Sequence, residues 1–264
     1  MFICPLCGEP LEENLKGLIC NNNHNFDKSK DGYVNLLLNT RHNLYDNNAL
    51  FTARRQAYEA DFFKPIGKYI NDVIKKDNEI NLLEAGCGEG SLLNYLCQHN
   101  KSMNFIGMDI SKIAIKKAAK TYKGIFWFVG DLCHIPLRDG KVKWIINMLA
   151  PANYDEFKRV LSEDGYLIKV VPNNNHLHEI RRLIGKEEHN LFNLDTINYL
   201  KSHALICENM RITYKVKCDK KLIESIYLMT PLTVNSDIDG LKNTNITSVT
   251  VDVQVLITKF QNQL

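Results

Sequence analysis

Short apolar runs alternate with segments of helical periodicity through the middle of the chain. Strands are predicted at 80–83, 103–109, 125–130, 143–148 and 165–171, with helices at 91–96, 112–123 and 154–161. Strands that alternate with helices in this way predict an α/β fold, a Rossmann-like sheet that is parallel and doubly wound. Ligands of such sheets bind at the carboxyl ends of the strands.

The flanking segments have different patterns. Helices are predicted at 49–76, 176–185 and 220–229, and strands at 210–218 and 248–260. In the last of these segments apolar and polar residues alternate cleanly, which predicts a strand buried on one face only. The polar stretch 40–48 is typical of a linker.

The composition is that of an ordinary globular protein. Of the 264 residues, 45% are hydrophobic and 24% charged, and the net charge of +3 permits a nucleic-acid partner without requiring one. No apolar run approaches the ~20 residues that span a membrane, and the N-terminus lacks the pattern of a secretory signal. Eight cysteines in such a chain predict reduced thiols or metal ligands, and we expect a cytoplasmic protein with no membrane partner.

Two closely spaced pairs of metal-ligand residues occur near the N-terminus. Cys4 and Cys7 are separated by two residues, and Cys20 and His24 by three. Both pairs lie in turn-forming sequence, so their side chains can reach the corners of one tetrahedron. A segment of ~30 residues cannot bury enough apolar surface to fold alone, so a bound metal ion would stabilise its fold. Three thiolates with one imidazole predict a structural Zn²⁺ site.

A glycine-rich turn at 84–90 lies between a predicted strand and a predicted helix. Its order, acidic-x-Gly-x-Gly-x-Gly, differs from the G-x-G-x-x-G spacing of nicotinamide-binding turns. It favours S-adenosylmethionine (SAM), whose methionyl tail needs main-chain room, here at Gly86 and Gly88, and an acceptor for its ammonium group. Glu84, at the end of the strand, meets that last need.

Acidic residues after the next two strands complete the expected cofactor site. Asp109 lies 21 residues beyond Gly88, close to the offset at which a carboxylate reaches the ribose hydroxyls. Asp131 and Leu132, just past the third strand, are placed to meet the adenine edge. Cys87 has no partner base nearby in the sequence and is interpreted as a packing residue.

The zinc-type N-terminus joined to this turn resembles the bacterial 23S ribosomal RNA guanine-N1 methyltransferases of the RlmA type. The resemblance covers nearly the whole chain, and its motifs lie at 4–7, 24–27, 31–37, 53–55, 86–90, 109–116, 150–151 and 229–231. It implies a zinc-binding RNA-recognition domain at 1–37, a linker and helix at 38–78, and a SAM-dependent methyltransferase domain at 79–264.

The resemblance also implies roles for individual residues. The zinc ligands would be the two N-terminal pairs described above. Cofactor contacts would come from Gly88, Glu89, His176 and Phe63. Phe63 stands where a tyrosine is usual, so a hydroxyl contact is lost while ring packing can remain. Glu84 replaces a usual aspartate, and Leu149 a usual tyrosine.

The implied substrate is N1 of a guanine in a hairpin loop of domain II of 23S rRNA. Two subgroups of the family methylate neighbouring guanines there, and one is linked to resistance to macrolides such as tylosin. A composition rich in lysine and asparagine suggests a low-GC Gram-positive source, which favours that branch. The reaction needs an unpaired guanine and a base for its N1 proton, and Asp46 is the candidate base.

Basic side chains are expected to contact RNA phosphates: Arg54, Arg55, Lys112, Lys116, Lys117, Arg181 and Arg182. Two other classes of function stay open. One is a small-molecule SAM methyltransferase in which the zinc module is only a structural cap. The other is a non-catalytic RNA-binding protein that retains the fold. The sequence also leaves open whether the chain forms a homodimer.

Overall fold

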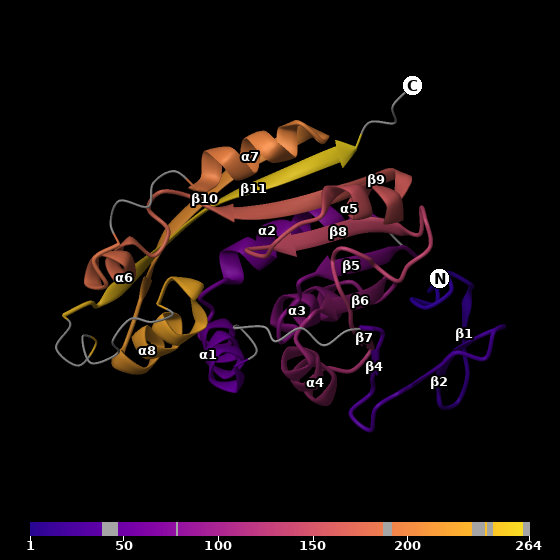
Figure 1. Cartoon of the computed structure of the whole chain (residues 1–264). Helices are drawn as coiled ribbons and strands as arrows, with labels where there is room; N and C mark the ends of the chain where they lie inside the picture. Colours follow the sequence, from indigo (N-terminus) through magenta and orange to yellow (C-terminus); the bar gives the residue numbers. More distant parts are fainter. Residues whose placement is uncertain (39–46, 78, 187–191, 234–240, 242–244, 261–264) are drawn as a thin grey trace.

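One large mixed sheet organises the chain. The computed structural model describes residues 1–38, 47–77, 79–186, 192–233, 241 and 245–260. The sheet has eight strands in the order β10-β11-β9-β8-β5-β6-β7-β4 (Figure 1). Their bounds are β4 Tyr33–Asn35, β5 Asn81–Ala85, β6 Asn104–Asp109, β7 Ile125–Val129, β8 Val142–Met148, β9 Leu161–Pro172, β10 Ala204–Lys217 and β11 Ser248–Phe260. The run from β9 to β4 is parallel, as predicted, whereas β11 and β10 are added antiparallel.

Helices cover both faces of this sheet. Their bounds are α1 Asn48–Glu59, α2 Lys64–Ile74, α3 Ser91–His99, α4 Lys112–Thr121, α5 Tyr154–Val160, α6 His178–Leu183, α7 Phe192–Lys201 and α8 Lys220–Met229. Leu82 of β5 belongs to the core beneath α1, α2, α3, α4 and α8, and the next residue, Leu83, to the core beneath α5 and α7. Successive residues of one strand therefore enter opposite layers. No helix in the described part of the chain is long and apolar enough to cross a membrane.

Local sequence signals set where the helices begin. The side chain of Ser111 accepts a hydrogen bond from the amide of Ala114 at 3.1 Å and caps α4. The region predicted as one helical stretch at 49–76 is divided into α1 and α2. Asp61 has a left-handed φ of +59°, and a proline occupies the first turn of α2. The break follows because neither feature continues a helix.

β11 differs from the half-buried strand that its alternation predicts. It lies between β10 and β9, and its second face is also covered: Asp252 and Thr258 are fully buried. The polar side chains of that face find partners, since Asp252 accepts from Arg211 and Thr258 donates to a main-chain oxygen of β9. The polar residues that alternate along β11 therefore lie in a second buried layer and do not face solvent.

The N-terminal segment forms a small antiparallel sheet of β1 Leu11–Glu13, β2 Gly17–Cys20 and β3 Asn25–Asp27, strands too short to predict from the sequence. It packs on the large sheet through Phe2, whose ring centroid lies 4.5 Å from that of Phe126. The chain then continues into β4, which pairs with β7 at the edge of the large sheet. The domain boundary predicted at residue 37 lies just after β4. The predicted small domain, 1–37, therefore includes one strand of the large sheet.

Candidate functional site

The turns of the small sheet bring the four predicted metal ligands together. Their ligand atoms all lie within 4.8 Å of one another. Cys4 Sγ and Cys20 Sγ lie 3.4 and 3.5 Å from His24 Nδ1, and Cys7 Sγ lies 3.8 Å from Cys20 Sγ. A tetrahedral zinc ion requires sulfur–sulfur and sulfur–nitrogen separations of about 3.8 and 3.6 Å. The site therefore fits Zn²⁺ with four protein ligands and no position open to a substrate.

The glycine-rich turn joins β5 to α3 and needs its glycines for two reasons. Gly86, Gly88 and Gly90 have φ values of +82°, +56° and +82°, which other residues rarely adopt. At Gly90 a Cβ would lie 2.4 Å from the ring of Trp127, so space also excludes a side chain. The amide of Gly88 donates to Asp109 at 2.8 Å, which ties the turn to the end of β6.

Two buried carboxyl groups flank this turn. Glu84 is 4% exposed, and its Oε2 has no hydrogen-bond partner among the described residues. Burial, reinforced by the charge of Glu89, raises the pKa of Glu84 well above its usual range. Glu89 is 1% exposed and accepts hydrogen bonds from Ser91 Oγ at 2.8 Å and Arg55 Nε at 3.3 Å. Oε2 of Glu84 thus lacks a partner among the described residues, whereas Glu89 is engaged, and a ligand with a positively charged N–H donor would supply that partner.

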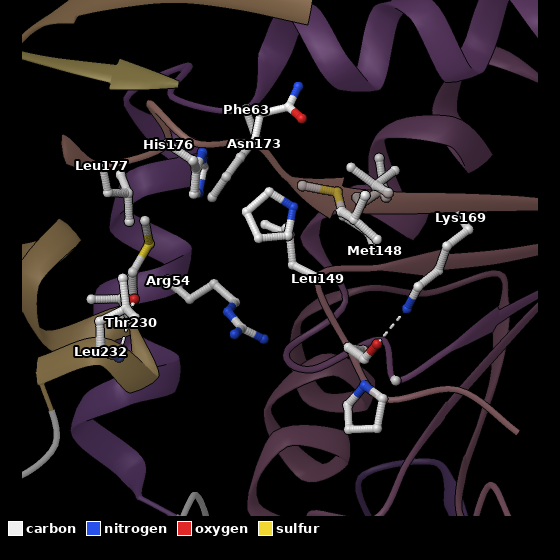
Figure 2. Close-up of a pocket in the computed structure, with 18 of the residues that line it drawn as sticks. Arg54, Phe63, Met148, Leu149, Lys169, Asn173, His176, Leu177, Thr230 and Leu232 are labelled. Atoms are coloured by element: carbon white, nitrogen blue, oxygen red, sulfur yellow. Dashed lines mark hydrogen bonds between the residues drawn. The ribbon is translucent and has the colours of Figure 1, made fainter. Parts of the chain in front are cut away.

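A cavity of about 660 Å³ opens beside the turn. Figure 2 shows Phe63, His176 and Arg54 around it, together with residues from the ends of β8 and β9. The ring of Phe63 packs on Tyr58 with centroids 5.0 Å apart. Burial lowers the pKa of His176 to about 4, so its ring is neutral at pH 7 and Nδ1 accepts from the amide of Asp252 at 3.3 Å. Phe63 and His176, predicted from distant parts of the sequence, therefore lie at one cavity.

The residues predicted for the ribose and adenine lie elsewhere on the sheet edge. Asp109 accepts hydrogen bonds at 2.8 Å from the amides of both Gly88 and Ser111. Asp131 and Leu132 follow β7 and are half-buried, and Asp131 accepts from the amide of Cys133 at 2.9 Å. None of Asp109, Asp131 and Leu132 lines the cavity beside the turn. Their contacts with adenosine stay a prediction.

A buried lysine that sequence reasoning missed supports the far wall of the cavity. Lys169 Nζ donates to the Ala150 carbonyl at 2.6 Å (Figure 2) and to Asn147 Oδ1 at 2.5 Å, and Asn147 donates to the Ala85 carbonyl at 2.7 Å. These bonds hold the segment containing Leu149, which has a left-handed φ of +51°. Burial lowers the pKa of Lys169 to about 8. Its signal in the sequence was a lysine inside the apolar run 165–171.

The basic residues predicted to contact RNA differ in their exposure and in their partners. Lys112, Lys116 and Arg182 are exposed, as a phosphate contact requires. Lys117 is half-buried, and its Nζ donates to Thr52 Oγ1 at 2.8 Å. Of the other three, Arg54 is half-buried and lines the cavity, whereas Arg55 and Arg181 have partners within the protein.

For Arg181 and Arg55 the structure argues against the predicted RNA contact. Arg181 is only 6% exposed and donates to the Asn174 carbonyl. Arg55 is held by Glu89 and by Thr121 Oγ1, the latter at 2.8 Å. These internal contacts compete with a phosphate contact, and an RNA contact by either arginine stays a prediction. Asp46, the candidate base, lies outside the described residues.

Comparisons with known proteins agree with both halves of this architecture. Residues 2–40 match the zinc-ribbon family described as RlmA, N-terminal, and residues 82–165 match a methyltransferase domain family. The chain is 35% identical over 97% of its length to Bacillus subtilis YxjB, provisionally named a 23S rRNA (guanine-N1-)-methyltransferase, and covers 96% of that protein. It is 28% identical to the 23S rRNA (guanine(748)-N1)-methyltransferase of Streptomyces fradiae, over 69% of this chain and 67% of the relative.

A solved structure shares the fold. A chain from the complex of the Haloferax volcanii Trm112 methyltransferase activator with a methyltransferase superposes with a TM-score of 0.56. The alignment covers 84% of this chain and all of the other, at 16% identity. At that identity the likeness concerns the fold alone.

SAM fits the residues that this chain offers. Gly86 and Cys87 of the turn line the cavity, so a ligand there can approach the main chain, and the unpartnered Oε2 of Glu84 suits an ammonium group. Phe63 and His176 present an aromatic ring and a neutral imidazole to the same space. The protein therefore carries a SAM site in its large domain and a structural zinc site in its small one.

Proposed function

The chain belongs to the family of 23S rRNA (guanine-N1-)-methyltransferases, and we propose that it methylates N1 of a guanine in a hairpin loop of domain II of 23S rRNA. The observation that carries the proposal is the full-length match to this family, in a chain that joins a four-ligand zinc ribbon to a SAM cavity. A zinc ribbon is not needed for methyl transfer itself, so we assign it to substrate recognition.

The chemistry asks three things of the protein. Guanine N1 carries a proton that must leave as the methyl group arrives, and base pairing hides this atom, so the target must be unpaired. SAM supplies an electrophilic methyl group, and the protein must align N1 with it and accept the proton. The cavity beside the glycine turn supplies the enclosed space, and the segment braced by Lys169 and Asn147 forms its far wall. Asp46 stays our candidate for the base.

RNA would approach over exposed basic side chains. Lys112 and Lys116 project from α4, and Arg182 from α6. Because each phosphate contact releases counterions, binding should weaken steeply as salt is raised. An affinity that does not depend on salt would argue against an RNA substrate. A ribosomal substrate also places the protein in the cytoplasm.

We further propose that the modified guanine is the one linked to tylosin resistance. The support is the match to the Streptomyces fradiae relative and the lysine- and asparagine-rich composition. Deleting the gene should then increase tylosin susceptibility, and the intact gene should restore it. Unchanged susceptibility together with a methylated neighbouring guanine would assign the chain to the other subgroup.

Incubation with radiolabelled SAM and undermodified 23S rRNA tests the main proposal. Label in the RNA, with a primer-extension stop in the domain II hairpin, is the expected result, and RNA already methylated at that N1 serves as the matched control. Label only in small metabolites would favour a small-molecule methyltransferase. RNA binding without any label would favour a non-catalytic RNA-binding protein. Single-turnover methylation that is unchanged in Asp46→Asn would exclude Asp46 as the base.

A further inference from the structure

An acidic and a basic side chain at the cavity have polar atoms without partners among the described residues. Glu84 Oε2 is buried without a hydrogen bond, and Arg54 takes part in no hydrogen bond or ion pair with any residue that the structure describes. Both line the same cavity, yet they do not pair with each other. Polar groups withdrawn from water without partners are costly, and a ligand that carries both an ammonium and a carboxylate group would satisfy Glu84 and Arg54 together.

The guanidinium of Arg54 lies directly over the glycine turn. Its Nη1 is 2.7 Å from the point that a Cβ on Gly88 would occupy, and its Cδ is 3.8 Å from it. Figure 2 shows the side chain reaching from α1 into the space between Thr230 and Leu149. A ligand seated on the turn would therefore meet five N–H donors that are not in use.

The neighbouring arginine has a different task. Arg55 Nε donates to Glu89 at 3.3 Å, Nη1 to Thr121 at 2.8 Å and Nη2 to the Lys117 carbonyl at 3.3 Å. Its guanidinium also lies over the ring of Tyr122. Arg55 thus joins α1 to α4 and neutralises Glu89, which leaves Arg54 as the cation of the pair that is available to a ligand.

We propose that Arg54 binds the α-carboxylate of the methionyl tail of SAM, opposite Glu84, which takes the α-ammonium group. The tail is a zwitterion, and a guanidinium with a carboxylate on two sides of one glycine turn is its complement in charge. The sequence had assigned Arg54 to RNA phosphates, whereas its position in the cavity assigns it to the cofactor. The inference rests on SAM as the methyl donor and not on the RNA target of the proposed function.

Calorimetric binding of two ligands to the full-length, zinc-loaded protein tests this role. S-adenosylhomocysteine carries the complete tail, and its decarboxylated analogue lacks only the carboxylate. Arg54→Gln should weaken binding of S-adenosylhomocysteine about 10- to 100-fold, the range for a charge-assisted hydrogen bond, and leave binding of the decarboxylated analogue unchanged. Arg54→Lys keeps the charge but not the planar guanidinium, so its affinity for S-adenosylhomocysteine should lie between those of the wild type and Arg54→Gln. Circular dichroism of the ligand-free variants checks that both fold.

Other outcomes overturn the role. Equal losses for both ligands would mean that Arg54 shapes the cavity without contacting the carboxylate. Tighter binding by Arg54→Gln would mean that the guanidinium obstructs the turn. If the wild-type protein binds neither ligand, SAM is excluded as the methyl donor, and the role of Arg54 is excluded as well. If the binding pattern is as expected but rRNA is not methylated, the RNA target fails and the role of Arg54 stands.

Discussion

Asp252 accepts two hydrogen bonds, each 2.9 Å long, from the guanidinium of Arg211 on the adjacent strand. The carboxyl group is fully buried in the centre of β11, behind His176. Burial alone would raise the pKa of Asp252, but the hydrogen bonds from Arg211 and Asn173 hold it below its ordinary value. The wall of the cofactor cavity is therefore backed by an ionised pair.

Asp252→Asn should lower the free energy of unfolding by about 1–3 kcal/mol at pH 7, because a charge-assisted bidentate contact is lost. A carboxyl group with a lowered folded-state pKa contributes its stability above the unfolded-state pKa, near 4, and loses it as the pH falls further. Urea unfolding should thus show a constant difference from wild type above pH 5 that shrinks below pH 4. Arg211→Gln removes the same contact, so the two substitutions should not be additive.

The buried imidazole of His176 should give the stability of the protein a second pH dependence, this time from a basic group. Its folded-state pKa is about 4, so between pH 6.5 and 4 the unfolded chain binds a proton that the folded chain does not. Stability is therefore lost as the pH falls through this window, by about 3 kcal/mol at most. The ligand-free His176→Asn variant should lack this loss. If the two proteins lose stability in parallel over this range, the imidazole is not held neutral by burial.

Gly90→Ala combines two penalties that a matched variant separates. Gly90 and Gly124 have nearly the same left-handed φ, +82° and +79°, but only Gly90 faces a ring where its Cβ would lie. Gly124→Ala should cost about 1 kcal/mol for the backbone alone, and Gly90→Ala about 3 kcal/mol because Trp127 must also move. Thermal unfolding of both variants measures the difference. Equal costs would mean that the ring yields without penalty.

Zinc removal should unfold the small sheet and weaken its packing on the large one. We expect one zinc ion per chain by mass spectrometry of metals, with loss of the metal in Cys20→Ser. Cys133→Ser provides the control, since Cys133 is exposed and lies outside the ligand group. Metal retained at full stoichiometry in Cys20→Ser would exclude the assigned ligand set.

The sequence predicted the elements that build the cofactor turn because their signals are local. The apolar run before Glu84 and the glycines that follow it act within a few residues, and the structure confirms the strand, the turn and the helix there. The metal ligands were equally clear because their spacing carries the geometry. Strands of three or four residues in the small sheet have no such periodicity.

What could not be predicted depends on contacts between distant segments. Nothing near Arg54 in the sequence indicates that α1 will place it over Gly88, and nothing near Asp252 indicates that a second layer will bury its face of β11. The same holds for Arg181: the sequence does not indicate that α6 buries Arg181 and leaves the adjacent Arg182 exposed. Burial thus changes the expected surroundings of charged residues that the sequence alone suggested were on the surface.

The edge strand β4 has a consequence for the order in which the protein is assembled during synthesis. Tyr33 pairs with Trp127, so the strand that closes this edge of the sheet leaves the ribosome long before its partner exists. The same is true of Phe2, which must wait for Phe126 and Phe128. Zinc allows the first segment to fold during that interval, because its four ligands all lie within the first 24 residues. We therefore expect the zinc ion to keep the N-terminal segment folded until the strands of the large sheet, on which this segment packs, have been translated.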